Sequence, residues 1–316
     1  MTTRRVAAVD CGTNSIRLLI ADLDESGTLT DVHREMRIVR LGQGVDATGA
    51  FVPEAIERTR VALHDYAKLM RDNDVTAVRM VATSATRDAS NREDFFAMTR
   101  DELGAVIPGA EAEVISGDEE ARLSFTGAVG ELSSADGPFV VVDLGGGSTE
   151  LVLGDENGVE AAFSADIGCV RITERHLHGD PPTAEEVAAA REFAAQRLAD
   201  AFAHVPVEHA NTWVGVAGTM TTIAAVSLDL PAYDATKVHL SRLSLDEVHA
   251  VSDRLVGMNR AERSAVPVIH PGRVDVIGGG GVILRVLADE LARRAGITEL
   301  VVSEHDILDG IALSIV

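Results

Sequence analysis

The chain has 316 residues, of which 46% are hydrophobic and 25% are charged, and its formal net charge is −22. This composition is typical of a globular protein large enough for two domains, and the negative charge argues against non-specific binding to nucleic acid or to an anionic membrane. No apolar run approaches the roughly 20 residues of a membrane helix, and the N-terminus does not resemble a signal peptide, so we expect a cytoplasmic protein.

The first predicted element is a hairpin at residues 6–22, VAAVDCGTNSIRLLIAD. Two apolar runs flank a polar turn that starts at Asp10, which predicts two strands joined by an exposed loop. Cys11 lies in this turn, and its distance from Cys169 in the sequence fits neither a metal site nor a disulfide framework. A small buried residue is the favoured interpretation of Cys11, and an oxidant-sensing thiol is the alternative.

Strands and helices then alternate. Residues 28–40 and 75–82 are predicted strands, an amphipathic helix starts at Pro53, and residues 91–103 form a second helix. A polar segment that ends at Arg87 follows the strand at 75–82. It therefore lies at the carboxyl end of that strand, where α/β proteins commonly bind ligands.

A helix is also predicted after Gly117, because Asp118, Glu119 and Glu120 follow it directly. Carboxylates in a first helical turn stabilise the positive end of the helix dipole, and this structural role is one interpretation. The other is a functional one, because this helix starts where the first predicted domain passes into the second.

Residues 139–155, FVVVDLGGGSTELVLGD, repeat the pattern of the first hairpin without a gap. Asp143 aligns with Asp10, whereas Glu150 aligns with Arg17. The glycines of this turn let several backbone N–H groups point into one space, as in phosphate sites. Asp143 and Glu150 are placed to hold a hard cation such as Mg²⁺ against such a phosphate. The duplication predicts two similar domains that face each other across a charged ligand.

The rest of the chain continues the α/β pattern. The expected elements are a strand at 159–165, a helix from Thr183 to about residue 204, a strand and glycine turn at 214–220, a helix capped by Ser244 and Glu247, a glycine loop followed by a helix at 277–294, and a final strand and helix. Arg171, Arg175, His176 and His178 lie close together in sequence. Solvated residues at a helix end are the favoured interpretation, and a basic substrate channel is the alternative.

Together these motifs resemble those of a known family. The duplicated hairpins resemble the actin/sugar-kinase/Hsp70-like superfold, and the match is narrowed by the stretches VDCGTNSIRLLIAD, VATSATRDASN, VISGDEEARLSFTGA and VVVDLGGGSTELVLG. These stretches resemble the exopolyphosphatase and guanosine pentaphosphate phosphohydrolase (Ppx/GppA) family, in its short two-domain form. The resemblance implies an α/β fold of two ribonuclease H-like (actin-like) domains with an interdomain cleft. We expect the domains at 1–125 and 126–316, with the last helix, about 304–316, crossing back toward the first.

The resemblance also implies roles for individual residues. Glu120 is implied as the general base and Arg87 as a phosphate-binding arginine of the catalytic site. The remaining implied residues bind phosphate (Asn14, Ser15, Arg17, Gly145, Gly146, Gly147 and Ser148) or the metal, Mg²⁺ or Mn²⁺ (Asp143 and Glu150).

The expected activity is hydrolysis of the terminal phosphoanhydride of polyphosphate, with short chains favoured because the protein is acidic and resembles members without a further C-terminal domain. Hydrolysis of guanosine pentaphosphate is the alternative, since it offers the same anhydride. A small-molecule kinase, with adenosine bound near the glycines at 215–219 and 278–281, and a non-enzymatic alarmone-binding protein are less favoured. A homodimer is plausible from the resemblance.

Overall fold

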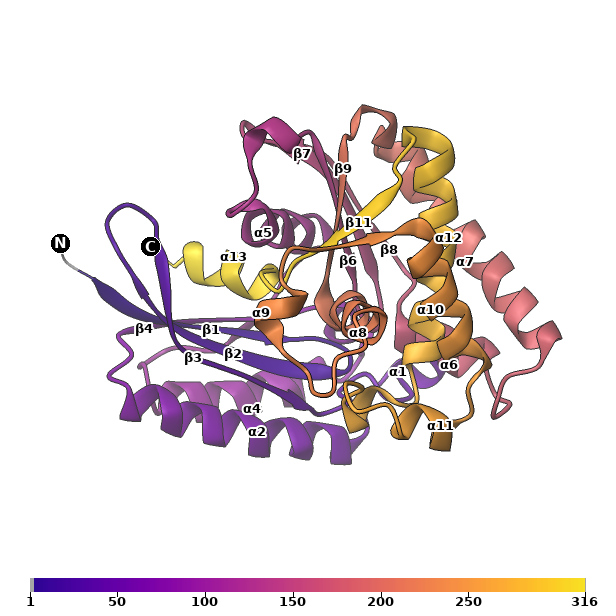
Figure 1. The fold of residues 1–316 in the computed structure, drawn as a ribbon. Coiled ribbons are helices and arrows are strands. Elements are labelled where there is room, and N and C mark those ends of the chain that lie inside the picture. The colour runs from indigo at the N-terminus through magenta and orange to yellow at the C-terminus, as the bar shows by residue number, and fades with distance from the viewer. Residues whose placement is uncertain (1–2, 316) are drawn as a thin grey trace. The chain divides into compact units, whose positions relative to one another are not determined.

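The structure, a computed structural model, describes residues 3–315. They form two compact units, one that runs to Gly127 and resumes at Ile307, and one that spans Ala128–Asp306. Each unit has one mixed sheet (Figure 1). The α/β class and the duplication predicted from the two hairpins are both confirmed.

The sheet of the first unit has the strand order β3-β2-β1-β4-β5. Its strands are β1 (Arg4–Cys11), β2 (Ser15–Leu23), β3 (Leu29–Ile38), β4 (Ala77–Ala82) and β5 (Ala112–Val114). The first three pair antiparallel, and β4 and β5 extend the sheet in parallel from β1. Strand β1 is therefore central, and it ends at the polar turn that begins the candidate site.

Helices cover both faces of this sheet (Figure 1). The helices of the unit are α1 (Val45–Thr48), α2 (Pro53–Asp72), α3 (Ser84–Asp88), α4 (Arg92–Gly104), α5 (Gly117–Val129) and α13 (Ile307–Leu313). Alternate residues of β1 belong to different cores, because successive side chains of a strand point to opposite faces. Ala7 and Val9 pack with residues of α2 and α4, whereas Val6 and Ala8 pack with residues of α13.

The second unit repeats this arrangement. Its sheet order, β10-β11-β9-β6-β7-β8, has an antiparallel meander from β6 to β8 with β9 and β11 added in parallel, as in the first unit. The strands are β6 (Phe139–Leu144), β7 (Thr149–Asp155), β8 (Gly158–Ala165), β9 (Thr212–Val216), β10 (Ser241–Ser244) and β11 (Glu299–Val302). The helices are α6 (Cys169–His176), α7 (Ala184–His204), α8 (Ala217–Ser227), α9 (Ala235–Val238), α10 (Leu245–Gly257), α11 (Arg260–Ser264) and α12 (Ile277–Ala295), and short 3₁₀ turns lie at Ser134–Asp136, Val207–His209 and Pro271–Arg273.

The prediction of a glycine loop at the start of 277–294 is wrong. Helix α12 already begins at Ile277, and the four glycines 278–281 are buried inside it. A Cβ atom on Gly279 would lie 2.3 Å from Thr173 Oγ1 of α6, and one on Gly280 would lie 2.5 Å from Thr219 Cγ2 of α8. The glycines therefore permit close helix packing in the core, and they do not form a loop that could receive a ligand.

Within residues 3–315, no helix is both long enough and apolar enough to span a bilayer.

Candidate functional site

Each hairpin ends in a tight turn of the same construction. In the first unit the N–H of Gly12 donates to the Ser15 carbonyl at 2.9 Å, and in the second the N–H of Gly145 donates to the Ser148 carbonyl at 3.1 Å. The N–H of Gly145 is therefore used within the turn. Of the predicted phosphate-binding residues of this turn, Gly146, Gly147 and Ser148 therefore stay the candidate backbone N–H donors.

The carbonyls of the glycine turn all point toward helix α6. The Gly145 carbonyl accepts from Cys169 N–H at 3.0 Å, and the Gly146 carbonyl accepts from Val170 N–H at 2.9 Å. A trans peptide directs its C=O and the following N–H in opposite directions, and the cis bonds of the described chain lie elsewhere. The N–H groups of Gly146 and Gly147 therefore point away from α6, to one side of the turn, as a phosphate site requires.

The first hairpin has the same construction against a different partner. The Thr13 carbonyl accepts from Gly42 N–H at 2.8 Å, and the Asn14 carbonyl accepts from Arg40 N–H at 2.9 Å. By the same peptide geometry, the N–H groups of Asn14 and Ser15 point away from the 39–42 segment. The predicted phosphate residues Asn14 and Ser15 thus correspond to the glycine turn of the second unit.

The two hairpins differ in one cross-strand pair. In the first, Asp10 pairs in register with Arg17, and the Arg17 guanidinium donates to Asp10 Oδ2 from Nη2 at 2.7 Å and from Nε at 2.9 Å. In the second, Asp143 pairs in register with Glu150, and both are buried. A buried salt bridge in one unit is replaced by two buried carboxylates in the other.

Two carboxylates side by side repel each other unless a proton or a cation lies with them. Ser164 donates a hydrogen bond to Glu150 Oε1 at 2.7 Å, which orients this carboxylate. Oxygen donors of this kind are those that Mg²⁺ and Mn²⁺ prefer. The residues at this position therefore fit a hard divalent cation, and the role of Asp143 and Glu150 as its ligands stays a prediction.

Arg87 and Glu120 form an ion pair in the first unit. Arg87 lies on the short helix α3 after β4, Glu120 lies in the first turn of α5, and Arg87 Nη1 is 2.7 Å from Glu120 Oε2. The same nitrogen donates to the Ile115 carbonyl at 3.1 Å, which fixes the arginine against the start of α5. The fold thus brings together the two residues predicted for catalysis, which are 33 residues apart in the sequence.

The three acids at the start of α5 differ in their surroundings. The side chains of Asp118 and Glu119 are 62% and 45% exposed, whereas that of Glu120 is 10% exposed. The first two also form surface pairs, with Arg122 at 3.1 Å and with Arg79 at 2.6 Å. Exposed acids of this kind stabilise a helix N-terminus, but this role does not require burial of Glu120. The burial of its side chain therefore distinguishes Glu120 from Asp118 and Glu119.

Two residues contact the glycine turn in a way that the sequence did not predict. A Cβ atom on Gly168 would lie 2.3 Å from the carbonyl carbon of Gly146, so only glycine permits this approach. Arg171 Nε donates to the Gly147 carbonyl at 2.9 Å, which places a positive charge next to the turn. The available signal was a glycine, Gly168, shortly after the predicted strand at 159–165, but the contact itself depends on how α6 packs.

Both thiols are buried, and burial raises the pKa of Cys11 and of Cys169 above the usual thiol range. A buried thiol with a raised pKa is a poor nucleophile, which favours the interpretation of Cys11 as a small core residue.

Comparisons with known proteins agree with this geometry. The sequence model of the Ppx/GppA phosphatase family matches residues 19–315. Exopolyphosphatase 2 of Mycobacterium tuberculosis is 63% identical over 318 residues, which cover 100% of this chain and 99% of that protein. Among solved structures, an exopolyphosphatase-like protein is 44% identical with a TM-score of 0.94, covering 99% and 98% of the two chains. The Aquifex aeolicus Ppx/GppA family member is 33% identical with a TM-score of 0.80, covering 99% and 97%.

Proposed function

This chain belongs to the Ppx/GppA phosphatase family, and we propose that it is a hydrolase that cleaves the terminal phosphoanhydride bond of inorganic polyphosphate and releases orthophosphate. The observation that carries this proposal is the ion pair between Arg87 and the buried carboxylate of Glu120. Arginine is a side chain that commonly binds phosphate. The high identity to an exopolyphosphatase over the full length of both chains supports the choice of substrate.

Glu120 is the proposed general base. Hydrolysis of a phosphoanhydride needs a water molecule in line with the bond that breaks, and a carboxylate that accepts its proton. Arg87 holds one oxygen of Glu120 at 2.7 Å, which restricts the rotamers of this long side chain. Correct placement of the base contributes to the rate because the attack requires a defined geometry.

The proposed phosphate ligands are the backbone N–H groups of the two turns together with Arg17 and Arg87. In the second unit these N–H groups belong to Gly146, Gly147 and Ser148, and Gly145 closes the turn. Such donors neutralise the charge that spreads over the phosphoryl oxygens in the transition state.

Asp143 and Glu150 would hold Mg²⁺ or Mn²⁺. When bound, the ion would supply charge neutralisation for the leaving phosphate. In the chain itself, Ser164 orients the Glu150 carboxylate for this role.

Short polyphosphate chains are the proposed preference, because a net charge of −22 repels a long polyanion. Guanosine pentaphosphate remains the second candidate, since the same groups would bind its terminal phosphates.

The kinase alternative loses its main support, since the glycines at 278–281 are packed inside helix α12. A cytoplasmic location and a homodimer stay predictions.

The test is phosphate release in the presence of Mg²⁺, measured side by side on short polyphosphate, long polyphosphate, guanosine pentaphosphate and ATP. We expect the highest kcat/KM on short polyphosphate. Preference for the guanosine nucleotide would replace the proposed substrate. No release from any of the four compounds would contradict the hydrolase proposal itself.

A further inference from the structure

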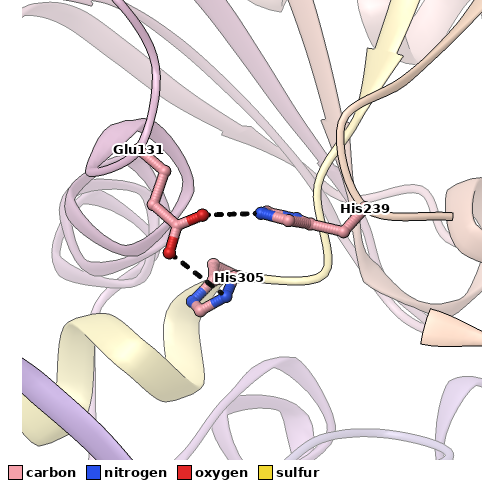
Figure 2. A group of neighbouring side chains, drawn as sticks. All are labelled: Glu131, His239 and His305. Atoms are coloured by element: carbon pink, nitrogen blue, oxygen red, sulfur yellow. Dashed lines mark hydrogen bonds and ion pairs between the residues drawn. The ribbon is translucent and has the colours of Figure 1, made fainter. Parts of the chain in front are cut away.

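A second group of potential metal ligands lies within the second unit, apart from the hairpin turns. Glu131, His239 and His305 direct one carboxylate and two imidazole rings toward each other (Figure 2). From this geometry we propose that the chain has a site for a borderline divalent cation, with Zn²⁺ as the best match. This site is separate from the Asp143 and Glu150 carboxylates.

The separations suit a small metal ion. His239 Nε2 lies 2.9 Å from Glu131 Oε2, and His305 Nε2 lies 3.9 Å from Glu131 Oε1. Tetrahedral zinc with bonds of about 2.0–2.1 Å holds its ligand atoms about 3.3 Å apart, which lies between these two values. One candidate ligand atom from each residue lies within 4.8 Å of the others. Small side-chain movements therefore suffice to close the site.

The donor types select the class of metal. Two imidazoles and one carboxylate are typical ligands of zinc and of other late first-row ions, whereas Mg²⁺ prefers oxygen donors alone. Three protein ligands also leave a position for water or another ligand. The side chains of His239, His305 and Glu131 are 21%, 34% and 58% exposed, so an ion can reach them from solvent.

The two histidines are held in place by the backbone around them. His239 is the C-cap residue of helix α9, and its backbone N–H donates to the Ala235 carbonyl at 2.8 Å. The hydroxyl of buried Ser303 accepts from His305 N–H at 3.1 Å and donates to the His305 carbonyl at 2.9 Å. Fixed ligands lower the entropic cost of binding an ion.

Binding must also change the tautomer of His239. The N–H of Glu304 donates to His239 Nδ1 at 3.2 Å, so the neutral ring carries its proton on Nε2 and donates it to Glu131. Zinc at Nε2 takes the place of that proton, and the neutral bound ring carries its proton on Nδ1 instead. The contact from Glu304 N–H is then lost, so zinc binding exposes this amide to exchange with solvent.

The ligands also join distant parts of the chain. Glu131 lies just after the chain enters the second unit at Ala128, and His305 lies just before it leaves at Asp306. An ion bound here would cross-link these two segments to the end of α9, and should raise the thermal midpoint of the protein.

The experiment uses the full chain, stripped of metal with a chelator and dialysed against Zn²⁺ in the presence of excess Mg²⁺. Bound zinc is measured by mass spectrometry, Co²⁺ is used as a spectroscopic substitute, and hydrogen exchange is followed at the Glu304 amide. We expect one zinc ion per chain, a visible Co²⁺ spectrum, and faster exchange at Glu304 with zinc. The double variant His239→Gln and His305→Gln removes two proposed direct ligands. Its zinc affinity should therefore fall by more than the roughly 10- to 100-fold that is typical when an outer-sphere partner of a ligand is lost.

Two matched controls keep the test specific. His209 faces a single carboxylate, Glu160, at 3.4 Å, so His209→Gln should bind zinc like the wild type. Glu150→Gln should also keep the zinc, because it changes only the proposed Mg²⁺ position. A wild-type chain that retains no zinc, or a double histidine variant that retains it in full, would overturn the proposal.

Discussion

Asp143 and Glu150 lie opposite each other on β6 and β7, at the register position that holds the Asp10–Arg17 salt bridge in the other unit. The duplication thus preserved the backbone of the hairpin while the charge of one side chain changed sign. A carboxylate pair can bind a cation and a salt bridge cannot, because the arginine already neutralises its aspartate.

The Glu150→Gln variant tests this assignment. It removes one negative charge and keeps an oxygen that can accept from Ser164, so we expect a folded protein that needs more Mg²⁺ for half-maximal activity. Phosphate release is measured over a range of Mg²⁺ concentrations. Ser164→Ala is the control and should shift the Mg²⁺ requirement less. An unchanged requirement in Glu150→Gln would argue against Glu150 as a metal ligand.

Arg17 has both a structural partner and a proposed phosphate role, which can be separated. Arg17→Met removes the guanidinium that donates two hydrogen bonds to the buried Asp10 carboxylate, and we expect a loss of about 3 kcal/mol in the free energy of unfolding. The double variant with Asp10→Asn also removes the charge of this carboxylate and should recover most of this stability without recovering activity. Urea denaturation and phosphate release are measured on both. Full activity in the double variant would show that Arg17 does not bind substrate.

Glu120→Gln should lose hydrolysis by about 10²-fold or more while substrate still binds, because glutamine cannot accept the proton of the attacking water. Binding is measured by equilibrium dialysis with a short polyphosphate, and turnover by phosphate release. Glu119→Gln is a close control, since Glu119 is the preceding residue but is 45% exposed and pairs with Arg79. Near-normal turnover by Glu120→Gln would rule out Glu120 as the base.

Gly168→Ala should displace the glycine turn, since the added Cβ would lie 2.3 Å from the Gly146 carbonyl carbon. A shift of about 1 Å at a reacting group can cost about 10²-fold in rate. We expect a large fall in kcat/KM for polyphosphate. Gly104→Ala, at the end of α4, meets no atom within 4 Å and should leave activity unchanged. Equal activity in both variants would mean that the turn position does not matter.

His176 makes stability depend on pH. Its pKa is lowered from 6.5 by burial, and further by the charges of Arg175 and His178, while its ring packs 4.8 Å from that of Phe193. The unfolded chain therefore binds a proton more readily than the folded one. The contribution of neutral His176 to the free energy of unfolding is fully present above about pH 6.5. It is lost as the pH falls from that value to the lower pKa that His176 has in the folded protein.

Thermal midpoints measured from pH 7.5 to pH 5 should fall less steeply in His176→Gln than in the wild type. His209→Gln, on the exposed surface, should show the wild-type slope. Identical slopes in all three proteins would contradict a lowered pKa for His176.

The two hairpins, their alignment and the candidate Asp143–Glu150 pair could be predicted from sequence, because all of these depend on local spacing. Residues that lie opposite each other across a tight hairpin are fixed by the length of its turn. The long helices with capping boxes at Thr183 and Ser244 were predicted for the same reason, since a cap is formed within four residues.

Other features were decided only by tertiary packing. The glycines at 278–281 looked like a loop, but they lie inside helix α12, where α6 and α8 leave no room for a side chain at Gly279 and Gly280. Sequence alone also left the three acids at 118–120 equivalent in environment, and only the fold buries Glu120 against Arg87. Glu131, His239 and His305 have no shared motif, because they are 108 and 66 residues apart and meet only when the segment after Val129, the end of α9 and the segment after β11 come together. Local spacing thus determines turns and caps, whereas contacts between distant segments depend on how the whole chain packs.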